Sequence, residues 1–392
     1  MYFSPKTSAD GLVFHYDTGN TVRSYLGEPT VNYVPGTYGY TTYAYVSGPV
    51  DTTALNEKNQ SITAKRYTIT NAINTARAAI FPSGLATGVA YTFSFKWKYN
   101  GTTTASPSVG IDASKGNPEG GANNNSFTSA TTNTVSIGNG WYLSTYTFVF
   151  SSIPTGNCML TFGIVTGTTA GYVGETFDIY EAQFEIKNHR TQYSNGTRSA
   201  TQGLKDLTAK NTIDISTVSF DANAQMTFDG TDDEINTGIT TQLTDFSCEV
   251  VFKNNNSEAW GRLVDKAYTN GFFVSSYFAS YGAGYVGAGI VEPNPPHGQA
   301  LQYDTSKYNY FVVTRSGTTH TIYLNGSTNS LSKTGSSATL GTAEMAIGAW
   351  YGSTSSQRFT GEIPVVKLYN RALTADEVAR NYNAIKSRFN IA

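Results

Sequence analysis

Four acidic residues lie close together in one stretch of the chain, and their spacing comes nearest to hydrolytic chemistry. They are Glu175, Asp178, Glu181 and Glu185. Cleavage of a glycosidic bond needs two carboxyl groups at a fixed separation on one face. Because side chains alternate between the faces of a strand, we expect Asp178 to point away from the other three. The sequence has no closely spaced acids that alternate along one strand. We therefore predict that these four residues are surface carboxylates or form a structural ion site. We expect no catalytic residues and no enzymatic activity.

Other catalytic arrangements are missing from the sequence. The four histidines do not have the spacing of metal ligands with one another or with a cysteine. They are His15, His189, His297 and His320. The sequence contains no nucleophile elbow, phosphate-binding loop or dinucleotide-binding fingerprint. Cys158 and Cys248 each lie in an apolar strand pattern, which favours two buried thiols over a disulfide.

Asp229, Asp232 and Asp233 form a second acidic cluster, in a segment that has the composition of a turn. Hard oxygen ligands on a loop suit Ca²⁺, so one interpretation is a calcium site. The other is a turn between two strands, in which Gly230 takes a positive φ and Asp232 or Asp233 accepts backbone amides. The general frequency of Asp in turns favours the turn, and we predict that no cofactor is required.

Aromatic side chains are the best indication of a binding function, since the chain has 27 Tyr and 21 Phe. Flat rings can stack on the C–H faces of sugars while amides and carboxylates bind the hydroxyls. Our candidates for contact with a glycan or a protein partner are Tyr38, Tyr40, Tyr43, Tyr45, Trp260, Tyr277, Tyr285, Trp350 and Tyr351. Protein contact is an equal alternative, because Tyr and Trp are enriched at interfaces generally. Trp97 and Trp141 lie in alternating strand patterns and are predicted to be core residues.

The composition excludes several classes of partner. Charged residues make up 14% of the chain, against about 25% in an ordinary soluble domain. The net charge is −2 and no basic run occurs, which argues against a nucleic-acid partner. The sequence has no apolar signal core at its beginning and no apolar run long enough to cross a membrane. We therefore expect synthesis in the cytoplasm without a signal peptide, and no membrane partner.

The elements that would position these side chains are almost all strands. The 392 residues exceed the size of one core, which rarely grows beyond about 250–300 residues. Residues 90–99 and 141–150 alternate strictly between apolar and polar, and further strands are expected at 11–16, 38–46, 66–71, 158–165 and 176–186. Residues 102–140 read as long loops around weak strands. The fold class is therefore all-β, with two antiparallel β-sandwich (jelly-roll) domains.

The polar segment at 188–212 is predicted to connect the two domains, and further strands are predicted between 213 and 369. One C-terminal α-helix completes the prediction. Thr374 is a good N-cap, and Glu377 three residues later completes a capping box. Val378, Tyr382, Ile385 and Phe389 then repeat at helical spacing. We expect this helix to cover a sheet edge or one end of a sandwich.

The second half resembles the concanavalin A-like, laminin-G-like sandwich family. The segments that carry the resemblance are FDGTDDEI (228–235), FSCEVVFK (246–253), YNYFVVTR (308–315), HTIYLNGS (320–327), AIGAW (346–350) and a strand, turn and capped helix at 359–389. Glu362 and Pro364 stand where that pattern often has a small or apolar residue. Members of this family often carry a calcium ion, which the resemblance implies for the cluster at Asp229, Asp232 and Asp233.

The first half resembles the carbohydrate-binding-module-like jelly rolls of phage structural proteins, through residues 140–150 and 177–199. Residues 11–27 instead look like the first strand of the laminin-G-like family. We therefore predict a jelly roll at 28–195, inserted into a laminin-G-like domain formed by 1–27 and 196–392. The hypothesis fails if residues 11–16 pair within the jelly-roll sheets.

These resemblances imply a structural protein of a bacteriophage virion. The leading hypothesis is a tail, fibre or surface-appendage module that binds host-surface polysaccharide, made in the host cytoplasm and released by lysis. The alternatives are a capsid decoration protein held by protein–protein contacts and, less favoured, a polysaccharide hydrolase. We expect other virion proteins as partners and a homo-oligomer on the particle. Fold resemblance alone does not establish function, so each of these remains a prediction.

Overall fold

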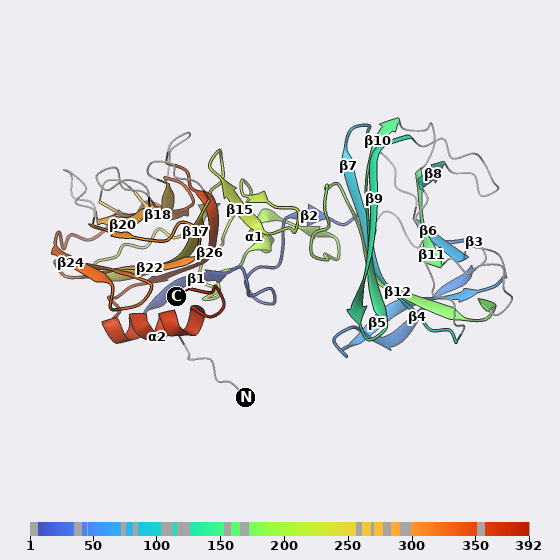
Figure 1. Cartoon of the computed structure of the whole chain (residues 1–392), viewed down its shortest axis with the longest axis horizontal. Coiled ribbons are helices and arrows are strands. Elements are labelled where there is room, and N and C mark those ends of the chain that lie inside the picture. Colours follow the sequence, from blue (N-terminus) through green and yellow to red (C-terminus); the bar gives the residue numbers. More distant parts are fainter. Residues whose placement is uncertain are drawn as a thin grey trace. The chain divides into compact units, whose positions relative to one another are not determined.

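The chain folds into two compact units (Figure 1), each described here by itself. The structure is a computed structural model, and it describes residues 7–34, 41–44, 46–71, 76–80, 85–102, 113–115, 126–152, 158–164, 172–255, 261–267, 270–276, 284–290, 299–350 and 357–391. Unit 1 comprises Met1–Pro29, Ser199–Asp221 and Gln225–Ala392. Unit 2 comprises Thr30–Arg198 and Ala222–Ala224.

The larger sheet of unit 1 is antiparallel and has eight strands. In the order of their hydrogen bonding they are β14 (Ser219–Phe220), β15 (Met226–Asp229), β26 (Thr360–Tyr369), β17 (Phe246–Asn254), β22 (Asn309–Ser316), β23 (Thr319–Leu324) and β24 (Ser330–Thr334). The eighth strand, β1 (Leu12–Asp17), pairs with β26, so that His15 lies opposite Lys367. The first strand of the chain therefore lies in the same sheet as the last, and not in a sheet of unit 2.

The second sheet of unit 1 faces the first across the main core. Its strands, in order, are β16 (Ile235–Asn236), β25 (Ala346–Ile347), β18 (Arg262–Lys266), β19 (Phe272–Ser275), β20 (Tyr285–Ile290) and β21 (Gln299–Gln302). Apolar side chains from both sheets fill the core, among them Phe14 of β1, Val250 of β17 and Phe272 of β19. Alternation along each strand leaves every second side chain facing away from this core.

Two helices occur among the described residues. The first, α1 (Ala200–Gly203), is a single turn within the predicted connecting segment. The second, α2 (Ala375–Ile385), begins as predicted: the Thr374 hydroxyl accepts the Glu377 amide, and the Glu377 carboxylate accepts the Thr374 amide. Val378, Tyr382 and Ile385 pack on the face of the larger sheet that is turned away from the core. No helix in the described ranges is both long enough and apolar enough to span a membrane.

Unit 2 is a second antiparallel sandwich. Its six-stranded sheet has the order β4 (Val46–Leu55), β5 (Ser61–Ile69), β12 (Thr176–Glu185), β7 (Ala90–Tyr99), β10 (Trp141–Ser152) and β9 (Ser126–Gly138). A four-stranded sheet has the order β3 (Thr41–Ala44), β6 (Ala76–Ile80), β11 (Cys158–Ile164) and β8 (Ala113–Lys115). A short pair of strands, β2 (Thr30–Val31) and β13 (Thr197–Arg198), joins the places where the chain enters and leaves the unit. The predicted all-β class of two sandwiches is thus confirmed.

Two local expectations were wrong, both in unit 2. Residues 126–138, expected to be loop around weak strands, form the continuous strand β9, because its Ser, Thr and Val residues can pair along the whole length of β10. The second error is in β12, where a β-bulge between Tyr180 and Gln183 places Glu181 at φ 49°. The extra residue resets the alternation of side chains, so that Ile179 and Ala182 both face the core.

Candidate functional site

The second sheet of unit 1 carries an unusual set of side chains on the face turned away from the main core. Phe272 and Val274 of β19 pack inward, and alternation turns Phe273 and Ser275 outward. Phe273 forms a small cluster of its own with Ala300 of β21 and Tyr285 of β20. This set, together with Arg262 and Asp265 of β18, is called the outer face below.

A buried ion pair lies on the outer face. The Arg262 Nε atom is 3.4 Å from Asp265 Oδ2, and the two side chains are 1% and 0% exposed. The centre of the Arg262 guanidinium lies 3.6 Å from the centre of the Phe273 ring, which is a close cation–π contact. Buried charges are costly to desolvate and gather at functional sites, so an ion pair outside the main core marks this face as a candidate.

A glycine makes the packing of Phe273 possible. Gly289 of β20 lies opposite Phe273 in the register of the two strands. A Cβ atom at Gly289 would lie 2.4 Å from Cε1 of the Phe273 ring, which is much closer than carbon atoms can approach. The ring therefore lies over bare backbone, and the cluster with Tyr285 and Ala300 depends on this glycine.

Strand register brings the half-buried aromatics to one end of the sheet. Arg262 pairs with Ser275, Ser275 pairs with Gly287, and Tyr285 begins β20 at that same end. Trp350 follows β25 by three residues, at the end where the Gly348 amide donates to the Leu263 carbonyl. Tyr285 and Trp350 are both partly exposed. The structure thus places two of the predicted contact residues at the same end of this sheet.

The other predicted contact residues are less well placed. The side chain of Tyr43, on β3, is not described. The remaining candidates lie outside the described residues and are Tyr38, Tyr40, Tyr45, Trp260, Tyr277 and Tyr351. In the sequence, Trp260, Tyr277 and Tyr351 directly adjoin Gly261, Ser276 and Trp350. Sequence reasoning missed Arg262, Asp265 and Phe273, and the available signal was three charged residues, Arg262, Asp265 and Lys266, in a strand of five.

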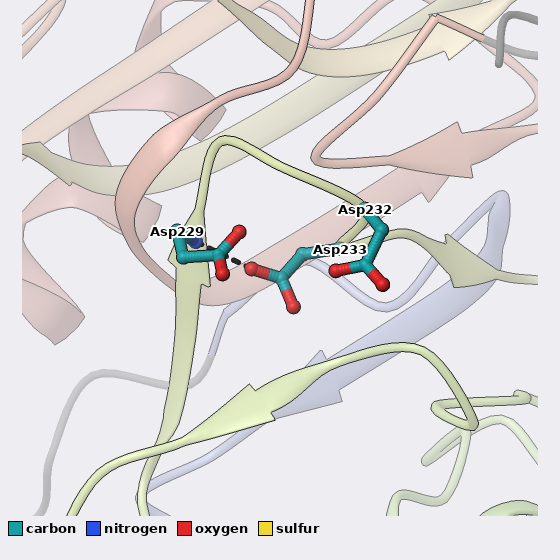
Figure 2. A group of neighbouring side chains, drawn as sticks. All are labelled: Asp229, Asp232 and Asp233. Carbon is teal, nitrogen blue, oxygen red and sulfur yellow. Dashed lines mark hydrogen bonds between the residues drawn. The ribbon is translucent and has the colours of Figure 1, made fainter. Parts of the chain in front are cut away.

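The acidic turn is compact (Figure 2). Carboxylate oxygens of Asp229, Asp232 and Asp233 lie within 4.8 Å of one another. Asp233 is fully buried, and its two oxygens accept the backbone amides of Ser219, at 2.6 Å, and of Asp229. Burial raises the pKa of Asp233, whereas acceptance of the Thr231 amide lowers the pKa of Asp229. These contacts match the turn interpretation better than a cation site, and calcium binding stays a prediction.

The four acids of unit 2 are all engaged, and the expected orientation of Asp178 was wrong. Phe177 and Ile179 face the core, so Asp178 faces outward, where it accepts two 2.7 Å hydrogen bonds from Arg66. The bulge in β12 turns Glu181 outward as well, 2.8 Å from Lys96. Alternation failed here because the bulge adds one residue between the two acids.

Glu175 and Glu185 are also held by neighbouring groups. Glu185 is fully buried and accepts hydrogen bonds from Thr30, Gln183 and both the amide and the hydroxyl of Thr191, at 2.7–2.9 Å. Glu175 accepts the Tyr99 hydroxyl and, at 2.7 Å, the Thr102 amide. Each described acid of this group is therefore used in an internal contact.

One thiol is an ordinary buried group, and one histidine is half-buried. Cys248 is buried and free, and burial raises the pKa of its thiol well above the usual value. The side chain of Cys158, on β11, is not described. His15 is paired along its backbone with Lys367 and is considered further below.

Comparison with known proteins gives one family match. Residues 228–379 match the model of the Laminin_G_3 family, described as the concanavalin A-like lectin/glucanases superfamily. This segment includes the acidic turn, the second sheet and all of the larger sheet except β1, β14 and the start of β15, and the match supports the predicted type of this domain. No curated protein matches the chain.

Several solved structures are weakly similar to parts of the chain. The CBM40 of a Ruminococcus gnavus IT-sialidase, bound to α2,3-sialyllactose, is 14% identical, with coverage of 35% of this chain and 81% of that one and a TM-score of 0.29. The binding domain of botulinum neurotoxin serotype G is 15% identical, with coverage of 46% and 48% and a TM-score of 0.36. Domain 4 of AbnA, a Geobacillus stearothermophilus arabinanase, in complex with arabinotriose, is 14% identical, with coverage of 47% and 93% and a TM-score of 0.36. All three TM-scores are low.

Proposed function

We propose that this protein is a non-enzymatic, glycan-binding structural protein of a bacteriophage particle, placed in a tail, fibre or other surface appendage. The observation that supports it most is the outer face of unit 1. There a buried Arg262–Asp265 pair and Phe273 lie beside the partly exposed Tyr285. Partly exposed aromatic rings can stack on sugar C–H faces, so Tyr285 and Trp350 are the groups that would contact the ligand, while Phe273 packs beside Tyr285 and supports it.

One further observation supports a carbohydrate ligand, and a second favours binding over cleavage. The matched family is described by the words lectin and glucanase, and both act on carbohydrate. The acids that come nearest to a hydrolytic pair are engaged in internal contacts, notably Glu185 with Thr191 and Asp178 with Arg66. We therefore expect the purified protein to release no reducing ends from host polysaccharide, and cleavage that is lost in Glu181→Gln would contradict a binding role.

Placement on a virion is supported by sequence alone. Residues 177–199 resemble the ends of jelly-roll modules in virion proteins, and low charge with abundant Tyr and Gly suits a rigid exposed module. A low-resolution map of the particle, with the protein labelled by antibody, tests the placement. Density on a tail or appendage agrees with the proposal, whereas density spread over the whole capsid together with no glycan binding would favour a decoration protein.

The binding role is tested on a glycan array with the full chain. We expect retention of at least one host-surface glycan by the wild type and a loss of about tenfold in affinity for Trp350→Ala and Tyr285→Ala. Leu331→Ala, a 41% exposed apolar residue on β24 of the other sheet, is the control and should bind normally. Failure of the wild type to retain any glycan would overturn the binding role.

A further inference from the structure

Unit 1 has a cleft of about 330 Å³ at its larger sheet, separate from the outer face. Five segments far apart in the sequence meet there: the end of β1, the start of β15, the start of β26, the residue before β22 and the turn after α2. Six of the residues that line the cleft are Thr18, Gln225, Tyr308, Glu362, Arg388 and Phe389. The convergence of so many elements gives the cleft a fixed shape.

Two aromatic rings form one wall of the cleft. The ring centres of Tyr308 and Phe389 are 5.0 Å apart, with 55° between their planes. The Lys253 ammonium lies 5.8 Å from the Tyr308 ring, and the Arg388 guanidinium lies 4.5 Å from the Phe389 ring. Both rings are partly exposed, so each can offer apolar surface to a ligand.

Two charged groups of the cleft, Glu362 and Arg388, already have hydrogen-bond partners. The Tyr308 hydroxyl donates to the Glu362 carboxylate, and burial raises the pKa of Tyr308, so this hydroxyl stays protonated at neutral pH. Arg388 donates to both oxygens of Asp17, with Nη1 2.6 Å from Oδ2. A Cβ at Gly19 would lie 2.4 Å from Arg388 Nη2, so the absence of a side chain there leaves space for the guanidinium.

We infer that this cleft binds a neutral sugar, one or two pyranose rings of a host polysaccharide. Its volume is at the lower end of the roughly 300–1,000 Å³ of ligand sites, which suits a small ligand. A wholly apolar ligand would strip water from the partly exposed Glu362 carboxylate, which is costly. An anionic ligand would face Glu362, while Arg388 is held by Asp17. The inference rests on the proposed glycan-binding role and adds a second site to it.

The family pattern does not account for this cleft. Glu362 and Pro364 depart from the laminin-G-like pattern, which often has small or apolar residues at these positions, and both line the cleft. The Glu362 carboxylate is the acceptor of the Tyr308 hydroxyl, so the departure supplies a polar group where a sugar hydroxyl would bind. The site is therefore a property of this chain.

The test measures sugar binding by the full chain through saturation-transfer NMR and titration calorimetry. The probes are cellobiose, maltose, lactose and N-acetyllactosamine, with 3′-sialyllactose as the anionic comparison. We expect binding of a neutral disaccharide that weakens about tenfold in Phe389→Ala. Lys386→Ala, which removes a side chain that lies over Tyr382 and not in the cleft, is the matched control and should bind like the wild type.

Tyr308→Phe keeps the test decisive if Phe389→Ala does not fold, because it removes only the hydroxyl that Glu362 accepts. A weaker affinity for the neutral disaccharide in this variant supports the inference. Binding that survives in both cleft variants but is lost in Trp350→Ala would overturn the cleft site and leave the proposed function standing. Preference for 3′-sialyllactose, or binding of no neutral probe by a wild type that binds other glycans on the array, would also overturn it. Binding of no glycan at all would overturn the proposed function itself.

Discussion

His15 illustrates how one residue makes the stability of unit 1 depend on pH. It lies on β1 opposite Lys367 of β26, and its backbone amide donates to Asp206 at 3.0 Å. Burial, and then the positive charge of Lys367, lowers the pKa of His15 from 6.5 to about 4. The folded protein therefore holds a neutral imidazole at pH values where the unfolded chain is already protonated. Since the unfolded state binds more protons, stability falls as pH decreases from 6.5 towards 4.

We predict that the wild type loses up to about 3 kcal/mol of unfolding free energy from this histidine between pH 6.5 and pH 4. Urea unfolding of the wild type and His15→Asn at both pH values measures the difference. The variant should show a smaller loss, because asparagine takes up no proton. His189→Asn, in unit 2, is the control. Equal pH dependence in wild type and His15→Asn would contradict the assignment.

Asp233 gives a second prediction at this scale, because its two interpretations differ in their response to calcium. Its oxygens accept the amides of Ser219 and Asp229, so Asp233→Ala should destabilise unit 1 by about 2 kcal/mol or more, with or without calcium. Asp232 is exposed, and Asp232→Ala should have little effect. Thermal unfolding in EDTA and in calcium chloride measures both. A calcium-dependent rise in Tm that is absent from Asp232→Ala would instead establish the metal site.

At the scale of elements, a buried polar network fixes α2 and the N-terminal segment on the larger sheet. Lys367 of β26 lies 3.0 Å from the Glu249 carboxylate of β17, and the Asn381 amide of α2 donates to the same carboxylate. The Ser8 backbone amide donates to the Asn381 side chain at 2.8 Å. All four residues are buried, so each contact is made in a medium where a lost partner is costly.

Glu249→Gln should therefore destabilise unit 1 by about 3–5 kcal/mol, because it leaves the Lys367 ammonium buried without a counter-charge. The double variant Glu249→Leu with Lys367→Met, which removes both charges, should recover much of this loss. Urea unfolding of the wild type, Glu249→Leu, Lys367→Met and the double variant forms a double-mutant cycle that gives the coupling energy. Additive effects in that cycle would show that the two charges do not act as a pair.

Elements with a local cause could be predicted from the sequence, and elements with a distant cause could not. The N-terminus of α2 follows from Thr374 and Glu377, three residues apart. Strand β7 follows from the alternation of Phe93, Phe95 and Trp97, which all pack in the core of unit 2. By contrast, the bulge at Glu181 inserts one residue without a local signal, and it turns Glu181 to the same face as Asp178 against the expected alternation.

The candidate sites differ in the same way. Tyr285 and Trp350 were predicted from their residue type, but the Arg262–Phe273 contact depends on the register of β18 with β19. The cleft is even harder to predict from the sequence, because Thr18 and Phe389 come from opposite ends of the chain. Only the three-dimensional path of β1 and α2 brings them together.

At the scale of the whole molecule, the chain leaves unit 1 and returns to it through one pair of strands. Thr30 of β2 is the register partner of Arg198 of β13. Antiparallel partners lie about 4.5–5.5 Å apart between Cα atoms, so the two ends of unit 2 are within the reach of a very short linker. Every described residue of the main core of unit 1 comes from outside this interval, and every described residue of the main core cluster of unit 2 comes from within it.

We predict that each unit folds without the other. Replacement of residues 30–198 by a short Gly-Ser linker should leave the unfolding transition of unit 1 nearly unchanged, because closing so short a loop adds little entropy. The isolated fragment 30–198 should unfold cooperatively, at the temperature at which unit 2 unfolds in the full chain. Circular dichroism and scanning calorimetry measure both.

Removal of residues 1–17 tests the role of the first strand. This deletion takes β1 out of the larger sheet and removes Phe14 and Tyr16 from the core of unit 1. It should therefore abolish the unfolding transition of unit 1 and leave that of unit 2 unchanged. If the excised chain fails to fold while the 1–17 deletion folds normally, the first strand is dispensable and the two units are not independent.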